Sequence, residues 1–302
     1  MNAESLLESY LYKSIKNCEN KNSPPRLISA IHHAVFPGGA RIRPRLSLAV
    51  AQACGNDEPD FALATACSIE FLHCASLVHD DLPCFDNADF RRGKPSVHKA
   101  FDERIAVLTG DALIILAYRV VASASVKDKN RLADVLHCIS NGVGVPEGIV
   151  AGQAWECESK ATLRQYQKAK TGALFYAATL SGAIASGDLS NDWGLLGEVL
   201  GEAYQVADDI RDVIANPTEL GKPTGQDESL GRMSSAKELG LSGAVNYFDD
   251  LINKAVLAVP DCKGAGKLKK LVQAESQRLV PKKGPMRVSR SIKSPSRVIY
   301  PG

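Results

Sequence analysis

The chain has 302 residues, of which 45% are hydrophobic and 23% are charged, and its net charge at pH 7 is only +2. This composition supplies enough apolar side chains for a sizeable core and excludes a chain that is disordered throughout. The length could hold two domains, but no linker interrupts the sequence before about residue 280, so we expect one compact domain over residues 1–279.

Apolar residues recur at helical spacing along most of the chain, and alternating strand patterns are rare. The expected helices, separated by short loops rich in Gly, Pro, Asn or Asp, span residues 3–19, 26–36, 42–54, 59–80, 103–123, 129–141, 145–157, 161–186, 191–214, 240–258 and 263–279. Small residues are dense in several of them, which permits close helix packing in a bundle. The sequence therefore predicts an all-α fold.

The two ends of the chain differ in character. Residues 280–302 carry six Lys and Arg residues and no acid, and we interpret them as a flexible, solvated tail rather than a contact for nucleic acid or anionic lipid. Residues 1–17 are amphipathic and contain acids, unlike a secretory signal. The longest apolar stretch is interrupted by Asp111 and Arg119, which predicts a buried helix rather than a membrane span.

Eight cysteines are scattered without a CxxC pair, and most lie in apolar helical runs. We expect reduced core residues of a cytoplasmic protein. The stretch "HCASLVH", with His73, Cys74 and His79, could suggest zinc, but no second ligand pair follows at a suitable distance. We therefore expect no zinc site.

A first cluster of aspartates, Asp80, Asp81 and Asp86, follows an apolar helix and precedes a pair of arginines. Pro83 ends or kinks this helix, so the first two carboxylates lie at a helix C-terminus, where the macrodipole disfavours negative charge. A positive partner must offset this charge. The neighbouring arginines are one candidate, and a divalent metal is the other.

A second cluster, Asp208, Asp209 and Asp212, lies far downstream. Asp208 and Asp212 are four residues apart and so project from one face of a helix. Ligation by carboxylate oxygens alone suits Mg²⁺, and two such clusters with arginines nearby suggest a metal-bound diphosphate. The alternative is two solvated acidic helix ends that form salt bridges with their neighbours.

The stretches "DDLPCFD" followed by "RRGKP", and "YQVADDIRD" about 120 residues later, resemble the two aspartate-rich motifs of the trans-isoprenyl diphosphate synthases. The four residues between Asp81 and Asp86 are similar to the bacterial and plastid geranylgeranyl or farnesyl diphosphate synthases. Further resemblance is carried by residues 37–46, 70–81, 108–113, 170–175 and 220–227, so that it spans about residues 25–275.

The resemblance implies a homodimer of single-domain orthogonal helix bundles, each around a deep apolar cavity, which condenses isopentenyl diphosphate with an allylic diphosphate. It implies that Mg²⁺ is bound by Asp80, Asp81, Asp86, Asp208, Asp209 and Asp212. It implies that the allylic diphosphate is bound by Arg91, Lys170, Thr171, Gln205 and Lys222, and isopentenyl diphosphate by Arg41, His73 and Arg92. Of these residues, Asp80, Asp81, Asp86, Asp208 and Lys170 would act in catalysis.

Product length is expected to depend on the residues one turn before Asp80. Ala75 and Ser76 are small, with Leu72 a further turn away, and helical geometry places them near a growing prenyl chain. In the resembling family a bulky aromatic residue here is typical of farnesyl synthesis, so Ala75 favours a longer product, geranylgeranyl diphosphate. The alternative is that these residues are small only for helix packing.

The sequence departs from the family pattern at a few positions. Ala40 stands where the family has a lysine, which removes one cation expected on isopentenyl diphosphate. Lysines are also usual at Gln226 and Arg232, and an aspartate is common at Ala88. A modulatory subunit without catalysis is therefore the alternative, although both aspartate motifs are intact. A terpene cyclase is disfavoured because the "GGARIRP" and "RRG" stretches would have no purpose there.

Overall fold

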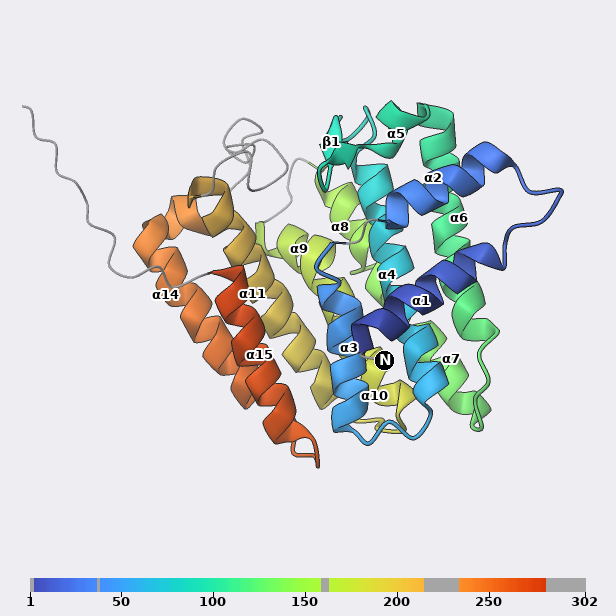
Figure 1. The fold of residues 1–302 in the computed structure, drawn as a ribbon. Helices are drawn as coiled ribbons and strands as arrows, with labels where there is room; N and C mark the ends of the chain where they lie inside the picture. The colour runs from blue at the N-terminus through green and yellow to red at the C-terminus, as the bar shows by residue number, and fades with distance from the viewer. Residues whose placement is uncertain (1–2, 37–38, 159–162, 215–233, 281–302) are drawn as a thin grey trace, which may run out of the picture.

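The computed structural model describes residues 3–36, 39–158, 163–214 and 234–280. Its helices are α1 (Ala3–Lys16), α2 (Pro25–Val35), α3 (Ile42–Ala53), α4 (Pro59–Asp80), α5 (Val97–Ala100), α6 (Glu103–Ala122), α7 (Lys129–Val143), α8 (Ile149–Trp155), α9 (Leu163–Gln167), the π-helix η1 (Lys168–Gly172), α10 (Ala173–Ala185), α11 (Asp192–Ile214), α14 (Ser235–Leu257) and α15 (Ala265–Leu279). The expected all-α fold is confirmed (Figure 1). The basic tail beyond Val280 lies outside the described residues.

Local sequence signals set many of the helix ends. Proline occupies the first turn of α2 and α4, where its missing N–H removes no helical hydrogen bond. The Asp102 carboxylate accepts a hydrogen bond from the Ile105 amide at 2.8 Å and so caps α6. Helix α4 ends at Asp80, as the sequence predicts, and Asp81 is its C-cap residue.

Three predicted helices differ clearly from the structure, and one element was not predicted. The helix expected over 240–258 begins earlier, at Ser235, with non-helical backbone at Gly240. The helix expected over 145–157 begins only at Ile149, because Gly144 ends α7 and the extended backbone of Gly148 precedes α8. The helix expected over 161–186 is divided into α9, η1 and α10. The unpredicted element is a short antiparallel hairpin, β1 (Phe90–Arg91) and β2 (Lys94–Pro95), which turns through the left-handed residues Arg92 and Gly93.

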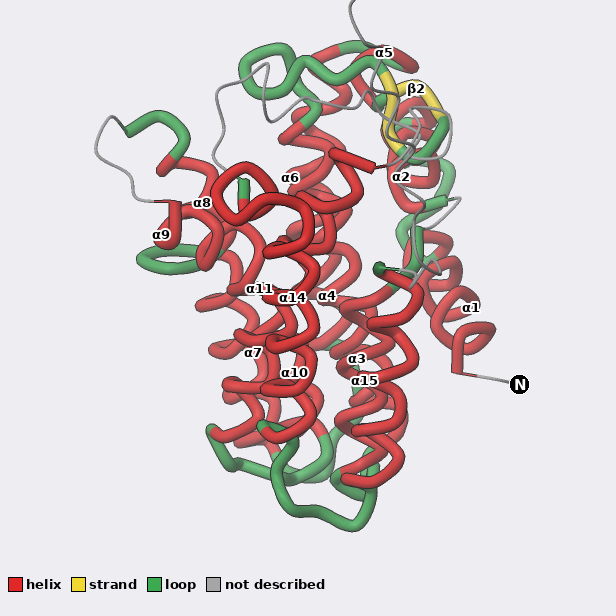
Figure 2. Tube along the Cα trace, turned by 90° about the vertical axis from the view of Figure 1, so that its left-hand side faces the viewer, coloured by secondary structure: helices red, strands yellow, loops and turns green. Residues whose placement is uncertain are grey.

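Helix α4 runs through the centre of the bundle and packs against α3, α6 and α10. Helices α1 and α2 lie across these helices, and α11, α14 and α15 form the opposite side (Figures 1 and 2). Helices α10 and α11 approach closely, because a Cβ atom at Gly197 of α11 would lie only 2.5 Å from the carbonyl oxygen of Phe175 in α10. The aspartate-rich end of α4 lies beside the hairpin at one end of the bundle, because Arg91 of β1 contacts Asp81 there.

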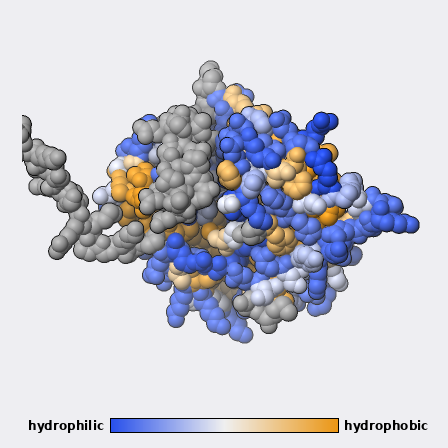
Figure 3. All heavy atoms as spheres, turned by 45° about the horizontal axis from the view of Figure 1, so that its top comes forward, coloured by the Kyte–Doolittle hydropathy of each residue, from blue (hydrophilic) through white to orange (hydrophobic). Residues whose placement is uncertain are grey.

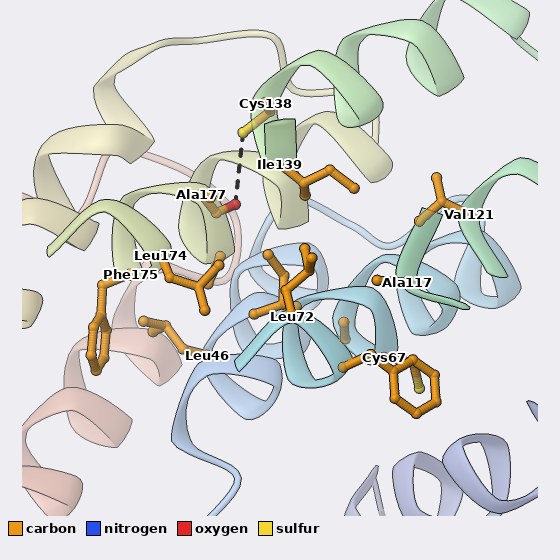
Figure 4. Packing of buried hydrophobic residues seen from close by; sticks show 14 of the residues in the cluster. Leu46, Cys67, Leu72, Ala117, Val121, Cys138, Ile139, Leu174, Phe175 and Ala177 are labelled. Atoms are coloured by element: carbon orange, nitrogen blue, oxygen red, sulfur yellow. Dashed lines mark hydrogen bonds between the residues drawn. The ribbon is translucent and has the colours of Figure 1, made fainter. Parts of the chain in front are cut away.

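The core surrounds the middle of α4. Leu72 of α4 lies among Ala117 of α6, Ile139 of α7 and Leu174 of α10 (Figure 4). Each of these side chains is at most 1% exposed, and full burial of a leucine stabilises the fold by roughly 1.5–3 kcal/mol. A small apolar pocket of about 50 Å³ lies elsewhere, between α3, α10, α11, α14 and α15.

Two helices, α4 and α6, are long and apolar enough to cross a membrane by length and composition alone. The most apolar segment of α4 is 78% buried inside the protein, as is common for the central helix of a soluble domain. The corresponding segment of α6 is only 44% buried. Helix α6 therefore exposes apolar side chains on one face, among them Val107, Leu108 and Ile115.

Candidate active site

The first aspartate cluster is built by the end of α4 and the hairpin that follows it. The guanidinium of Arg91 donates to both oxygens of Asp81, from Nε to Oδ1 at 3.0 Å and to Oδ2 at 3.2 Å, and Nη2 adds a contact to Oδ1. Asp81 is buried, which raises the pKa of its carboxyl group, while Arg91 opposes this change. The Asp86 amide donates to the Asp80 carbonyl at 3.0 Å, which draws the third aspartate back toward the helix end.

Asp80 has a different set of partners. Its Oδ1 atom accepts hydrogen bonds from Nε2 of Gln153 at 2.5 Å and from Nζ of Lys170 at 3.2 Å. Nζ of Lys170 also donates to Oε1 of Glu156 at 2.7 Å. Burial alone would lower the pKa of Lys170, but Asp80, Tyr166 and Glu156 outweigh this effect and raise the pKa above its usual value. Lys170 is therefore a charged ammonium group next to the first motif.

The π-helix η1 connects the two aspartate clusters. Lys170 reaches Asp80 on α4, and the next residue, Thr171, donates from Oγ1 to Oε1 of Gln205 on α11 at 2.8 Å. Single π-helical turns are rare and occur frequently at functional sites. The predicted diphosphate ligands Lys170, Thr171 and Gln205 thus form one connected group.

The second aspartate cluster occupies the last turns of α11. Asp209 is buried, and its two oxygens accept hydrogen bonds from Nε2 of Gln205 at 2.9 Å and from the Ser235 amide at 2.8 Å. In this conformation Asp209 attaches the start of α14 to α11. Asp208 and Asp212 are partly exposed, and Asp208 lies 3.6 Å from Nη2 of Arg211.

Arg43 of α3, His73 of α4 and Arg92 of the hairpin form a second positively charged group, the Arg43 cluster. Nη1 of Arg43 lies 3.4 Å from Nε2 of His73. Burial, and then the charges of Arg43 and Arg92, hold the pKa of His73 well below its usual range. Nε of Arg43 and Nη1 of Arg92 are buried and have no hydrogen-bond partner among the described residues. Buried cationic donors of this kind favour an anionic ligand.

Arg41 lies outside this cluster, although the sequence analysis assigned it to isopentenyl diphosphate. Its side chain is 1% exposed and donates to Glu8 at 2.7 Å and to Glu70 at 2.5 Å. Arg43, two positions later, was not predicted as a site residue. Arg41 is the N-cap residue of α3, with left-handed backbone at φ 49°, whereas Arg43 lies in the first turn of the helix, and only Arg43 contacts His73. The spacing alone does not say which arginine it is.

The remaining predicted site residues lie in several environments. Ala75 and Leu72 are buried in the continuous core, and Oγ of Ser76 donates to the His73 carbonyl at 2.8 Å. Ala40 is exposed. Lys222 lies outside the described residues, as do Gln226 and Arg232. Figure 3 turns the hairpin end of the molecule forward and shows mainly hydrophilic residues outside the grey atoms.

The aspartate oxygens fit Mg²⁺ by their chemistry, since this ion prefers a few carboxylates together with substrate phosphates. Asp80 and Asp81 are paired with Lys170 and Arg91 in this conformation. Within the described part of the chain, no group of three or more His, Cys, Asp or Glu side chains is arranged around a common metal position. Of the six predicted ligands, both oxygens of Asp209 accept hydrogen bonds from Gln205 and Ser235. The oxygens that could hold the ion in this conformation belong to Asp80, Asp81, Asp86, Asp208 and Asp212.

The sequence comparisons place this geometry in a known context. The family model described as polyprenyl synthetase matches residues 24–254. A geranylgeranyl diphosphate synthase of Cereibacter sphaeroides is 45% identical over 278 residues, which cover 92% of this chain and 96% of that protein. A geranylgeranyl diphosphate synthase of Rhodobacter capsulatus is also 45% identical, over 93% of this chain and 97% of its own.

Solved structures agree with the sequence comparisons. A geranyltransferase from Helicobacter pylori, complexed with magnesium and isoprenyl diphosphate, has a TM-score of 0.77 and 30% sequence identity. The similarity covers 92% of this chain and 99% of that one. A geranyltransferase from Legionella pneumophila has a TM-score of 0.76 and 28% identity, over 91% of this chain and 94% of its own.

Proposed function

The chain belongs to the polyprenyl synthetase family, and from this premise we propose that it condenses isopentenyl diphosphate with an allylic diphosphate to give geranylgeranyl diphosphate. The expectation of a prenyl-transferring enzyme of this family is confirmed. The observation that carries the proposal is the Arg43 cluster beside the first aspartate motif. Together with Lys170 and Arg91, this cluster provides one cationic group for each of two diphosphates.

The two cationic groups divide the substrates between them. The diphosphate of the allylic substrate is held by the cations Lys170 and Arg91 and by the neutral side chains of Thr171 and Gln205. Lys222 is a further proposed ligand of this diphosphate. Arg43, His73 and Arg92 hold the diphosphate of isopentenyl diphosphate. His73 is neutral in the free protein because its pKa is lowered, so it accepts a hydrogen bond from Arg43 and does not repel it. Arg41 has a structural role in this assignment, between Glu8 and Glu70.

The proposed Mg²⁺ ions, bound by Asp80, Asp81, Asp86, Asp208 and Asp212, would neutralise the charge that develops on the departing diphosphate. Lys170 and Arg91 stabilise the same charge through hydrogen bonds that strengthen as the carbon–oxygen bond breaks. The electron pair of that bond leaves with the diphosphate. The double bond of isopentenyl diphosphate then attacks the allylic cation, and the released diphosphate accepts the proton that is lost. The protein supplies no nucleophile in this scheme.

We expect no nucleic-acid partner for the proposed enzyme and no helix that spans a membrane. All of the described cysteines are free, which suits the reducing cytoplasm.

We propose a homodimer through the apolar face of α6, where Ile115 is 68% exposed. A second copy of the same face could cover this surface by two-fold symmetry. Sedimentation velocity should give twice the mass of the 32.3-kDa chain, and the mass of one chain would contradict the dimer.

The proposed C20 product rests on Ala75. Replacing Ala75 by Phe is expected to shift the main product from C20 toward C15, because a ring at this buried position would occupy space needed by the last isoprene unit. Chain-length analysis of the products by reversed-phase chromatography measures the shift. An unchanged C20 product from a variant with normal thermal stability would leave Ala75 with a packing role only.

The direct test of the function is to incubate the purified protein with labelled isopentenyl diphosphate and each of the C5, C10 and C15 allylic diphosphates. Mg²⁺ is supplied with and without a chelator. A C20 product that disappears with chelator is expected. A folded protein that forms no product with any primer would contradict the proposed catalysis and favour a modulatory subunit, with Ala40 as the first residue to examine.

A further inference from the structure

Glu156, the C-cap residue of α8, contacts Lys170 together with Asp80. Its Oε1 atom lies 2.7 Å from Nζ of Lys170 and accepts a hydrogen bond from the Tyr166 hydroxyl at 2.5 Å. We propose that Glu156 and Tyr166 are positioning residues that aim Lys170 at the allylic diphosphate. This inference rests on the proposed function, and neither residue was singled out from the sequence.

The backbone holds α8 against Lys170. A Cβ atom at Gly152 would lie 2.3 Å from the backbone nitrogen of Lys170, so only glycine allows this approach. Gln153 and Glu156 are three residues apart, so both side chains lie on one side of α8. Gln153 donates to Asp80 and Glu156 accepts from Lys170. One edge of α8 therefore supports both members of the Asp80–Lys170 pair.

The contacts around Lys170 leave a defined direction for a ligand. An ammonium group has three N–H donors, and hydrogen bonds to Asp80 and Glu156 use two of them. The ring of Tyr166 lies 5.4 Å from Nζ, within the range of a cation–π contact. The side chain of Lys170 is only 18% exposed. A lysine has four rotatable side-chain bonds, so without Glu156 and Tyr166 the ammonium would sample other positions and meet the diphosphate less often.

The positioning role differs from a simple structural tether between α8 and η1. A tether would change the stability of this region and would weaken the binding of both substrates to the same extent. A positioning group would weaken mainly the binding of the substrate that Lys170 contacts. A control for the tether exists on the same π-helix, where Nζ of Lys168 pairs with Glu198 of α11 at 3.2 Å.

The experiment compares Glu156→Ala, Glu156→Gln, Tyr166→Phe and the control Glu198→Ala with the wild type. Glu156→Ala should raise the KM for the allylic diphosphate about tenfold and lower kcat, with little change in the KM for isopentenyl diphosphate, as expected if the misplaced Lys170 loses its charge-assisted hydrogen bond to the diphosphate. Glu156→Gln should keep most of the wild-type activity, because its amide oxygen can still accept hydrogen bonds from Lys170 and Tyr166. Tyr166→Phe should show a smaller loss, and Glu198→Ala should behave as the wild type.

A second readout does not depend on turnover. Titration calorimetry with inorganic diphosphate and Mg²⁺ should show about tenfold weaker binding to Glu156→Ala than to the wild type. Equal effects on both substrates, or a loss of thermal stability with unchanged diphosphate binding, would overturn the positioning role. If the wild type binds diphosphate but forms no product, the proposed function fails, while the calorimetric comparison still decides the role of Glu156.

Discussion

Replacement of Asp80 or Asp208 by Ala is expected to lower kcat by about 10³-fold or more, while the fold remains intact. The two carboxylates lie on different helices, and each would contribute ligands for the metal that neutralises the leaving diphosphate. A loss of this size corresponds to about 4 kcal/mol of transition-state stabilisation. Steady-state turnover with saturating Mg²⁺ and both substrates measures it.

Thermal unfolding separates this chemical effect from a loss of structure. Mg²⁺ with inorganic diphosphate should raise the melting temperature of the wild type and have little effect on either variant, because a ligand stabilises only the protein that binds it. Asp192→Ala is a suitable control, since it removes a carboxylate from the opposite end of α11. Near-normal turnover in Asp80→Ala and Asp208→Ala would contradict the assignment of both clusters to the metal.

Replacement of Arg43 by Gln is expected to raise the KM for isopentenyl diphosphate by about 10- to 100-fold, with a much smaller change for the allylic substrate. The buried Nε of Arg43 has no partner among the described residues, and a charged hydrogen bond to a diphosphate contributes roughly 1.5–3 kcal/mol. Initial rates measured over a matrix of both substrate concentrations separate the two KM values.

Arg41→Gln is the matched comparison, since the two arginines lie in the same turn of the chain. Arg41 forms buried ion pairs with Glu8 and Glu70, so its loss leaves Glu70 without its main partner and should cost about 3–5 kcal/mol of stability. A lower melting temperature is expected, without a selective change in the KM for isopentenyl diphosphate. The reverse pattern, with Arg41→Gln acting on that substrate and Arg43→Gln only on stability, would return the role to Arg41.

Several features followed from the sequence alone. The helical period of apolar residues predicted the all-α fold, because this period decides which side chains of an isolated helix can be buried together. Helix α4 was predicted with its observed ends, since Pro59 begins it and Pro83 follows its last turn. The aspartate motifs identified the family because they are short, local and chemically distinctive. Their roles as metal ligands stay predictions.

Other features depend on contacts between segments that are far apart in the chain. Arg43 rather than Arg41 lies beside His73, because Arg41 is the left-handed N-cap residue of α3 and is bound by the buried Glu70 of α4. The placement of Glu156 beside Lys170 depends on the close approach that Gly152 allows. The break of the predicted helix over 161–186 at η1 likewise turns consecutive residues toward α4 and α11. Local sequence sets which residues are helical, whereas the rotation and distance of packed helices decide which charged groups meet.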